Sequence, residues 1–246
     1  MSPAHAPLAP VYDAAFYDAQ EAGSLRSARV VVPLVLDLVQ PSSVLDVGCG
    51  LGTWLSAVVE NGVTDVLGLD GAHVDRSRLK IPDAHFRPTD LRQVPALGRG
   101  FELAMCLEVV EHLPSAASER IVDLLTQAAP AVLFSAALPG QGGRRHINER
   151  WPEHWERLFS ARGFVRLDPI RPRVWRHREV EWWYQQNLFL FVREGHLERH
   201  PALRAERDLA RDFRFELVQE RAFRKAVGAR FAWPGQLWRA VRRSFG

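Results

Sequence analysis

Short apolar runs alternate along the chain with segments in which apolar residues return at every third or fourth position. Brief runs rich in β-branched residues are typical of buried strands, and the longer periodic segments are typical of helices. The predicted strands are Val44–Val47, Val66–Leu69, His85–Phe86, Leu103–Leu107, Val132–Ser135, Phe164–Leu167 and Leu188–Val192. Because strands that alternate with helices pair in parallel, the pattern predicts an α/β fold with a seven-stranded, mostly parallel sheet flanked by helices.

The segments on either side of this alternation predict further helices. Leu25–Val39 carries apolar residues at helical spacing and stops before Pro41, and Tyr12–Gln20 predicts a separate lid helix. After about Glu194 the alternation is lost, and the chain becomes charged and amphipathic. We therefore expect N-terminal lid and edge helices over residues 1–40, a ligand-binding domain over 41–193 and a helical C-terminal appendage over 194–246.

The most informative motif is the glycine-rich turn that follows the first predicted strand. Gly48, Gly50 and Gly52 stand between that strand and a helix that begins near Thr53. Residues without a Cβ permit a tight turn and let a ligand approach the main chain. The spacing is G-x-G-x-G and not the G-x-G-x-x-G of dinucleotide enzymes.

An acidic residue, Asp70, ends the second predicted strand. A carboxylate at this position can accept hydrogen bonds from both hydroxyls of a ribose. A structural glycine turn with a surface aspartate is the alternative. The two features together, in a strand–turn–helix context, favour a nucleoside site.

The glycine turn and Asp70 resemble the cofactor motifs of class I S-adenosylmethionine-dependent methyltransferases, and the resemblance runs from about Val44 to Val192. It implies a Rossmann-like fold, with S-adenosylmethionine as cofactor and S-adenosylhomocysteine as product. Asp46 and the turn would line the methionine portion, Asp70 would hold the ribose, and residues 89–91 would flank adenine. The resemblance implies these cofactor-side residues: Asp46, Gly48, Cys49, Gly50, Thr53, Trp54, Asp70, Gly71, Thr89, Asp90, Leu91, Leu107, Glu108, Val109 and His112.

Methyl transfer to a hydroxyl requires a group that removes the acceptor's proton. His146 follows the glycine-rich loop after the fifth predicted strand, and ligands of open α/β sheets bind at such strand ends. The ordinary imidazole pKa of about 6.5 suits proton transfer near neutral pH. His146 is therefore our candidate general base, with a loop or cap role as the alternative. Asn148 and Glu149 would orient it or cap the helix that begins near Trp151.

Aromatic rings beside polar groups suit the binding of sugars, whose C–H faces stack on aromatics, although core packing is the commoner fate of a tryptophan. Glu111 and His112 lie in the turn after the fourth predicted strand. They could start a helix, which is a structural role, or contact the ligand directly, and both roles stay open. The acceptor-side candidates are Glu111, Asn148, Glu149, Trp151, Trp183 and Tyr184.

The wider pattern resembles a bacterial subgroup that modifies sugars and secondary metabolites. It implies an O-methyltransferase for a small polar acceptor, such as a sugar or a glycosylated metabolite. The alternatives are an N- or C-methyltransferase, an enzyme for aromatic natural products, or an RNA-modifying enzyme that uses the basic C-terminal segment.

Charge and composition narrow the choice of partner and compartment. The 32 Lys and Arg residues nearly balance 29 Asp and Glu residues, and the late arginines are mixed with acids, which favours a solvated helix face over a nucleic-acid site. Two cysteines, Cys49 and Cys106, support neither a disulfide framework nor a cysteine zinc site. No signal segment or membrane-length apolar run is present, so we expect a cytoplasmic protein without a membrane partner. The sequence leaves open whether the chain forms a homodimer. A divalent metal is possible, although no residue spacing indicates a site for one.

Overall fold

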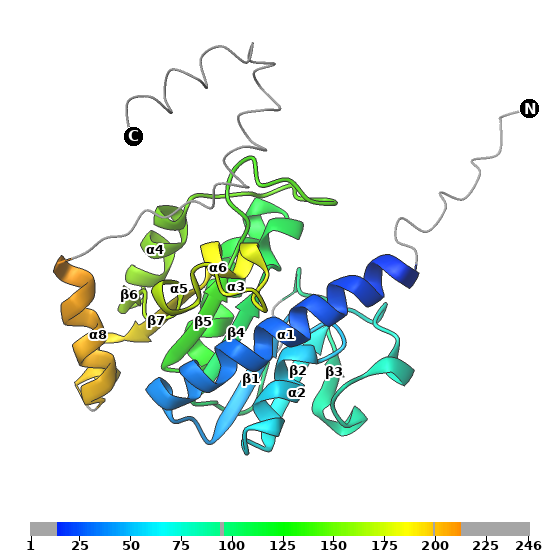
Figure 1. The fold of residues 1–246 in the computed structure, drawn as a ribbon, viewed down its shortest axis with the longest axis horizontal. Coiled ribbons are helices and arrows are strands. Elements are labelled where there is room, and N and C mark those ends of the chain that lie inside the picture. The colour runs from blue at the N-terminus through cyan, green and yellow to red at the C-terminus, as the bar shows by residue number, and fades with distance from the viewer. Residues whose placement is uncertain (1–13, 94–95, 199, 213–246) are drawn as a thin grey trace, which may run out of the picture.

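The computed structural model describes residues 14–93, 96–198 and 200–212, which contain one seven-stranded sheet with helices on both faces (Figure 1). The strand order is β3-β2-β1-β4-β5-β7-β6, and only β7 runs antiparallel to its neighbours. The strands are β1 (Ser43–Val47), β2 (Asp65–Asp70), β3 (Phe86–Pro88), β4 (Leu103–Leu107), β5 (Ala131–Ser135), β6 (Phe164–Leu167) and β7 (Phe189–Arg193). The predicted α/β class and all seven predicted strands are confirmed. Two residues of the predicted strands lie outside the observed ones: His85 is in a short 3-10 turn, and Leu188 follows α6 directly before β7.

The helices of the described residues connect these strands. They are α1 (Ala14–Val39), α2 (Thr53–Glu60), α3 (Ser115–Ala128), α4 (Pro152–Ser160), α5 (Arg171–Val174), α6 (Trp182–Asn187), α7 (Glu194–Leu197) and α8 (Pro201–Asp212), with single 3-10 turns η1 (Arg76–Arg78), η2 (Asp83–His85) and η3 (Val110–His112). Helices α1 and α2 lie side by side on one face of the sheet (Figure 1). Helices α3 and α4 cover the other face.

Period-two alternation along the central strands explains why both faces of the sheet are covered. On β5, Ala131 and Leu133 pack in the cluster that contains α1 and α2, whereas Val132 and Phe134 pack in the cluster that contains α3 and α4. Every residue of β1, β4 and β5 is buried. Strands enclosed on both faces read as continuous apolar runs, which is why they were predictable from the sequence.

The lid helix predicted over Tyr12–Gln20 is not a separate element, and this prediction is wrong for its described part. Helix α1 runs without a break from Ala14 to Val39, and residues 12 and 13 lie outside the described residues. Gly23 lies between the two predicted helices, Tyr12–Gln20 and Leu25–Val39. A Cβ at Gly23 would meet Oε1 of Glu181 at 2.5 Å, so this glycine allows α1 to approach the loop before α6.

The first part of the predicted C-terminal appendage packs on the sheet. Leu197 of α7 and Leu203 of α8 are fully buried in the same cluster as the inner side of α1. Residues 213–246, which hold most of the late arginines, lie outside the described residues. The division of the chain at residue 194 stays a prediction.

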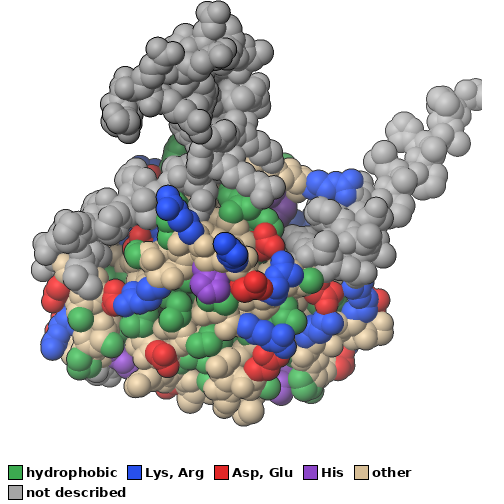
Figure 2. All heavy atoms as spheres, in the orientation of Figure 1, with side chains coloured by type: hydrophobic (Ala, Val, Ile, Leu, Met, Phe, Trp, Pro, Cys, Tyr) green, Lys and Arg blue, Asp and Glu red, His purple; other side chains and the backbone are tan. Residues whose placement is uncertain are grey.

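The surface of the described residues mixes charges of both signs on the face shown in Figure 2. None of the described helices is long and apolar enough to cross a membrane.

Candidate functional site

The carboxyl ends of the parallel strands meet at one edge of the sheet, and the loops that follow them are joined by backbone hydrogen bonds. The backbone N–H of Gly48, after β1, donates to the carbonyl of Leu69 in β2 at 2.7 Å. The N–H of Glu108, after β4, donates to both the carbonyl and the hydroxyl of Ser135 in β5, each at 3.1 Å. Ligands of open α/β sheets bind at this edge.

The glycine turn after β1 requires residues without a side chain for two different reasons. Gly48 has a φ of 85°, and a Cβ there would lie 2.3 Å from Cγ2 of Val109. Gly50 has a φ of 53°, and a Cβ there would meet nothing within 4 Å. The turn is therefore packed tightly at Gly48, while the main chain at Gly50 faces open space that a ligand can fill.

Gly48→Ala is expected to destabilise the fold through both the clash with Val109 and the left-handed backbone. Strain of the second kind alone costs about 1–3 kcal/mol. Gly62→Ala is the matched control, because Gly62 has a φ of 94° and open space around it. Chemical denaturation should give a larger loss of unfolding free energy for Gly48→Ala than for Gly62→Ala. Equal losses would contradict the close approach of Val109.

Asp70 connects the glycine turn to the end of β2. Its Oδ2 accepts from the backbone N–H of Gly50 at 2.7 Å, and its Oδ1 accepts from that of Gly71 at 2.6 Å. The side chain is 15% exposed. Each carboxylate oxygen has more than one lone pair, so both oxygens can still accept from ligand hydroxyls. The position fits the predicted ribose role.

Asp46 is on β1 just before the turn, Cys49 is within the turn, and both side chains are buried. Asp46 is 2% exposed, and burial, followed by the nearby charge of Asp70, raises the pKa of its carboxyl to about 8. Burial also raises the pKa of the Cys49 thiol, which stays protonated and unreactive. A cationic group placed beside Asp46 would favour its charged form.

The predicted adenine-side residues follow β3. The backbone N–H of Thr89 donates to the carbonyl of Asp70 at 2.7 Å, which brings this segment beside the ribose candidate. Asp90 forms a two-point ion pair with Arg92 at the surface, which lowers the pKa of its carboxyl. Leu91 is buried in the core cluster on the α3 side of the sheet.

Glu108 has a φ of 55° and connects three segments through its carboxylate. Its Oε2 accepts from the amide of Gln141 at 3.2 Å, and its Oε1 accepts from the amide of Asn187 at 3.0 Å. Asn187 also donates to Oε1 of Gln141 at 3.0 Å. Burial raises the pKa of the Glu108 carboxyl, while these amides oppose the shift. Gln141 and Asn187 were not among the predicted site residues. Gln141 lies within a glycine-rich loop and Asn187 directly before an apolar strand, and neither setting indicates a shared partner.

The aromatic candidates separate into buried and exposed residues. Tyr184 packs edge-on against Trp54, with ring centroids 5.0 Å apart, and burial raises the pKa of its hydroxyl to about 12. Its hydroxyl lies 3.2 Å from Oγ of Ser24 in α1. Trp183 is half-buried, whereas Trp151 is 53% exposed at the start of α4. Trp54 and Tyr184 thus pack in the core beside the site, and Trp151 is accessible to a ligand.

His146 is held by Glu149. Its Nδ1 lies 3.1 Å from Oε1 of Glu149, whose two oxygens also accept from the backbone N–H groups of Gly140 at 2.7 Å and Gly142 at 2.9 Å. The ring lies directly over Gly143, where a Cβ would meet Nε2 at 2.2 Å. The loop after β5 is thus folded around one carboxylate that also orients the imidazole.

Asn148 anchors the same loop from the other side. Its amide donates to the carbonyl of Val110 at 3.2 Å and to Oγ of Ser118 at 2.8 Å, and its side chain is buried. The N-cap of α4 is Trp151, which makes no side-chain capping bond. Of the two open roles, Glu149 therefore orients His146, and neither Glu149 nor Asn148 caps α4.

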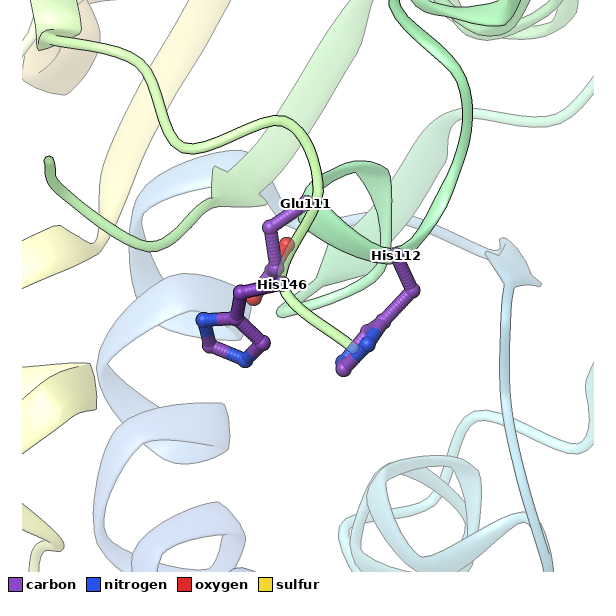
Figure 3. Close-up of side chains that lie close together, drawn as sticks. All are labelled: Glu111, His112 and His146. Carbon is purple, nitrogen blue, oxygen red and sulfur yellow. The ribbon is translucent and has the colours of Figure 1, made fainter. Parts of the chain in front are cut away.

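Glu111 and His112 of η3 lie beside His146 (Figure 3). The two imidazole rings project to the same side and pack edge-on, with centroids 4.8 Å apart. Burial, followed by the neighbouring His146, lowers the pKa of His112. Glu111 is fully buried, and burial together with Glu108 raises the pKa of its carboxyl well above the usual range. One ligand atom from each of the three residues lies within 4.8 Å of the other two, so the group is also the metal-binding candidate among the described residues.

Solved structures share this fold at low sequence identity. DesVI of Streptomyces venezuelae has a TM-score of 0.56 and 19% identity, over 73% of this chain and 95% of that chain. The sugar N-methyltransferase KedS8 from Streptoalloteichus sp ATCC 53650 has a TM-score of 0.57 and 18% identity, over 78% and 96%. The magnesium protoporphyrin IX methyltransferase ChlM from Synechocystis PCC 6803, with bound S-adenosylmethionine, has a TM-score of 0.53 and 21% identity, over 75% and 86%.

The sequence comparisons agree with the fold. No curated protein matches the chain. A family model described as a methyltransferase domain matches residues 17–220, which include the glycine turn, Asp70 and the loop of His146. The chain therefore belongs to the methyltransferase-domain family, with the fold of class I S-adenosylmethionine-dependent methyltransferases.

Proposed function

We propose that this protein is an S-adenosylmethionine-dependent O-methyltransferase for a small polar acceptor, such as a sugar or a glycosylated metabolite. The observation that carries the proposal is the pairing of His146 with Glu149 at the sheet edge that also holds the glycine turn and Asp70. An imidazole oriented by a carboxylate can activate a hydroxyl, whereas an amine free base needs little such help.

The sheet edge that carries the glycine turn and Asp70 fits S-adenosylmethionine. This cofactor supplies a methyl group on a positively charged sulfur. The open main chain at Gly50 leaves room for the methionine portion. The buried Asp46 suits the cationic amino group, and both oxygens of Asp70 can accept from the ribose hydroxyls. The buried network around Glu108 and Asn187 holds the neighbouring loops in place.

His146 activates the acceptor in this proposal. Because Nδ1 is engaged by Glu149, Nε2 is the nitrogen that can act on the acceptor, and in the simplest form it accepts the hydroxyl proton. The acceptor oxygen then forms a bond to the methyl carbon as the carbon–sulfur bond breaks, and that electron pair stays on sulfur. The protein contributes mainly the alignment of the reacting atoms and the removal of the proton.

Exposed apolar side chains beside His146 support a sugar-like acceptor. Ile147 is 65% exposed and Trp151 is 53% exposed, and both follow His146 within five residues. Flat or branched apolar surface next to polar groups suits the C–H face and the hydroxyls of a sugar ring. KedS8, which shares the fold, is named as a sugar N-methyltransferase.

A matched panel of acceptors tests the proposal. Pairs of sugars that carry a hydroxyl or an amine at the same position would be incubated with the full chain and S-adenosylmethionine, and release of S-adenosylhomocysteine would be measured. We expect turnover with hydroxyl acceptors. Turnover with the amines alone would move the assignment to nitrogen, and transfer to RNA alone would favour the RNA-modifying alternative.

The affinity for S-adenosylmethionine should rise with pH, because Asp46 must lose its proton to pair with the amino group. Since the pKa of Asp46 is about 8, affinity should weaken by roughly tenfold between pH 7 and pH 6, a range in which the amino group of the ligand stays charged. Calorimetry in buffers of different ionisation enthalpy should show proton release on binding at pH 7. Asp46→Asn is the control and should bind more weakly without this pH dependence. A wild-type affinity that is flat across this range would refute the role of Asp46.

A further inference from the structure

We infer that Glu111, His112 and His146 form a binding site for one divalent metal ion of the first transition series, such as Mn²⁺, Fe²⁺ or Zn²⁺. The three residues come from two loops, η3 after β4 and the loop after β5, and one ligand atom of each lies within 4.8 Å of the others. Ion binding does not depend on the proposed function, whereas the role given to the ion below rests on it.

The first observation in favour of a bound ion is the buried environment of the Glu111 carboxyl group. Its side chain is fully buried, and no side-chain amide, hydroxyl or basic group of the described residues donates a hydrogen bond to either carboxylate oxygen. Its side-chain contact is the carboxyl of Glu108, with which it can share one proton, and a second acid cannot balance the charge of a carboxylate. A buried carboxyl group is normally paired, hydrogen-bonded or bound to a metal, because leaving it unpaired costs several kcal/mol. A cation beside Glu111 supplies the missing partner.

The two histidines are held as metal-binding histidines are. Nδ1 of His146 is engaged by Glu149, which leaves Nε2 as the available lone pair. The ring of His112 lies against the backbone carbonyls of Arg144 and Arg145. Histidine ligands usually donate their second ring nitrogen to a carboxylate or a backbone carbonyl, which fixes the ring and its tautomer. Both imidazoles are therefore oriented before any ion arrives.

The ligand types select the class of ion. Two imidazole nitrogens with one carboxylate suit first-row transition metals, whereas Mg²⁺ and Ca²⁺ prefer oxygen ligands throughout. Metal–ligand distances of about 2.0–2.2 Å bring ligand atoms to roughly 3–3.5 Å from one another. The ligand atoms of the three residues, which lie within 4.8 Å of one another, would therefore have to approach one another more closely when an ion binds. Three protein ligands leave further positions open.

The open positions give the ion a role in the proposed function. An acceptor hydroxyl bound to the cation becomes more acidic, as metal-bound water does. In this form His146 would hold the ion, and the proton of the acidified hydroxyl would pass to solvent water and not to His146. An experiment can distinguish His146 as proton acceptor from His146 as metal ligand. Only in the second case should a chelator lower the rate of methyl transfer.

Ion binding is tested directly on the chelator-treated full chain. MnCl₂ would be titrated with free Mn²⁺ counted by electron paramagnetic resonance, and ZnCl₂ by calorimetry. We expect one ion per chain. Glu111→Gln, His112→Ala and His146→Ala should each weaken binding by at least about tenfold, since even the loss of a group that only orients a ligand costs that much. His200→Ala is the control and should bind normally, because His200 stacks on His196 away from this group. His112 is exposed, so its variant should fold even if Glu111→Gln does not.

The outcomes separate the inference from the proposed function. Binding of one ion that all three variants weaken supports the site, even if no hydroxyl acceptor is ever methylated. No bound ion, or binding that the three variants leave unchanged, overturns the site. If a methylated acceptor is found, chelation should reduce turnover by at least tenfold and Mn²⁺ or Zn²⁺ should restore it. Turnover that chelation leaves unchanged would overturn the catalytic role of the ion.

Discussion

His146→Ala is expected to lose methyl transfer by about 10²–10⁴-fold while S-adenosylmethionine binds with unchanged affinity. The reason is the position of the residue: it lies on the loop after β5, where it contacts Glu149, Gly143 and His112, and the glycine turn and Asp70 lie after other strands. Turnover would be measured by release of S-adenosylhomocysteine and affinity by calorimetry. The same loss is expected whether His146 takes the proton itself or holds a cation.

Two further variants make this prediction specific. Glu149→Gln keeps the size of the side chain and should lower turnover less than His146→Ala, because it changes the orientation of the ring and not its presence. His177→Ala removes an exposed histidine elsewhere and should leave turnover unchanged. If His146→Ala turns over at a rate near that of the wild type, or loses cofactor binding in proportion to activity, the acceptor side is assigned wrongly.

Asp70→Ala is expected to weaken S-adenosylmethionine binding by about 1.5–3 kcal/mol, or roughly 10–150-fold. The substitution removes acceptors for the ribose hydroxyls and also the two bonds that hold the N–H groups of Gly50 and Gly71. Calorimetry gives the affinity. Asp65→Ala is the matched control, since Asp65 begins the same strand but pairs with Arg99 at the opposite end.

The control makes the ribose assignment refutable. Asp65→Ala should bind with the affinity of the wild type, and Asp70→Asn should fall between the wild type and Asp70→Ala. An Asp70→Ala protein that is folded by circular dichroism and binds with full affinity would refute the ribose role.

The parts of the fold that were predictable depend on local pattern. The central strands are apolar on both faces, so their runs stand out, and the glycine turn lies within a few residues of the strand that it follows. Helix α1 was predicted as two helices because the helical spacing of apolar residues weakens near Gly23. The sequence did not indicate that Gly23 packs against Glu181, which is more than 150 residues away.

The acceptor side was only partly predictable for the same reason. Glu111, His112 and His146 were each singled out, yet their proximity depends on how the loop after β5 folds. That fold depends on one carboxylate, Glu149, which binds two glycine N–H groups and the His146 ring together. Residue spacing of 34 positions between His112 and His146 carries no such information. Gln141 and Asn187 were missed because their partner, Glu108, is distant in sequence.

Transfer of an isotopically labelled methyl group shows whether the enzyme methylates oxygen, nitrogen or carbon. The full chain would be incubated with S-adenosylmethionine carrying ¹³C in its methyl group and with the acceptor that gives the most turnover, and the product would be examined by ¹³C nuclear magnetic resonance. We expect a methyl signal with the shift of a methoxy group, absent with His146→Ala and strongly reduced with Asp70→Ala at limiting cofactor. A methyl signal on nitrogen or carbon, or a methoxy signal that His146→Ala leaves at full strength, would contradict this expectation.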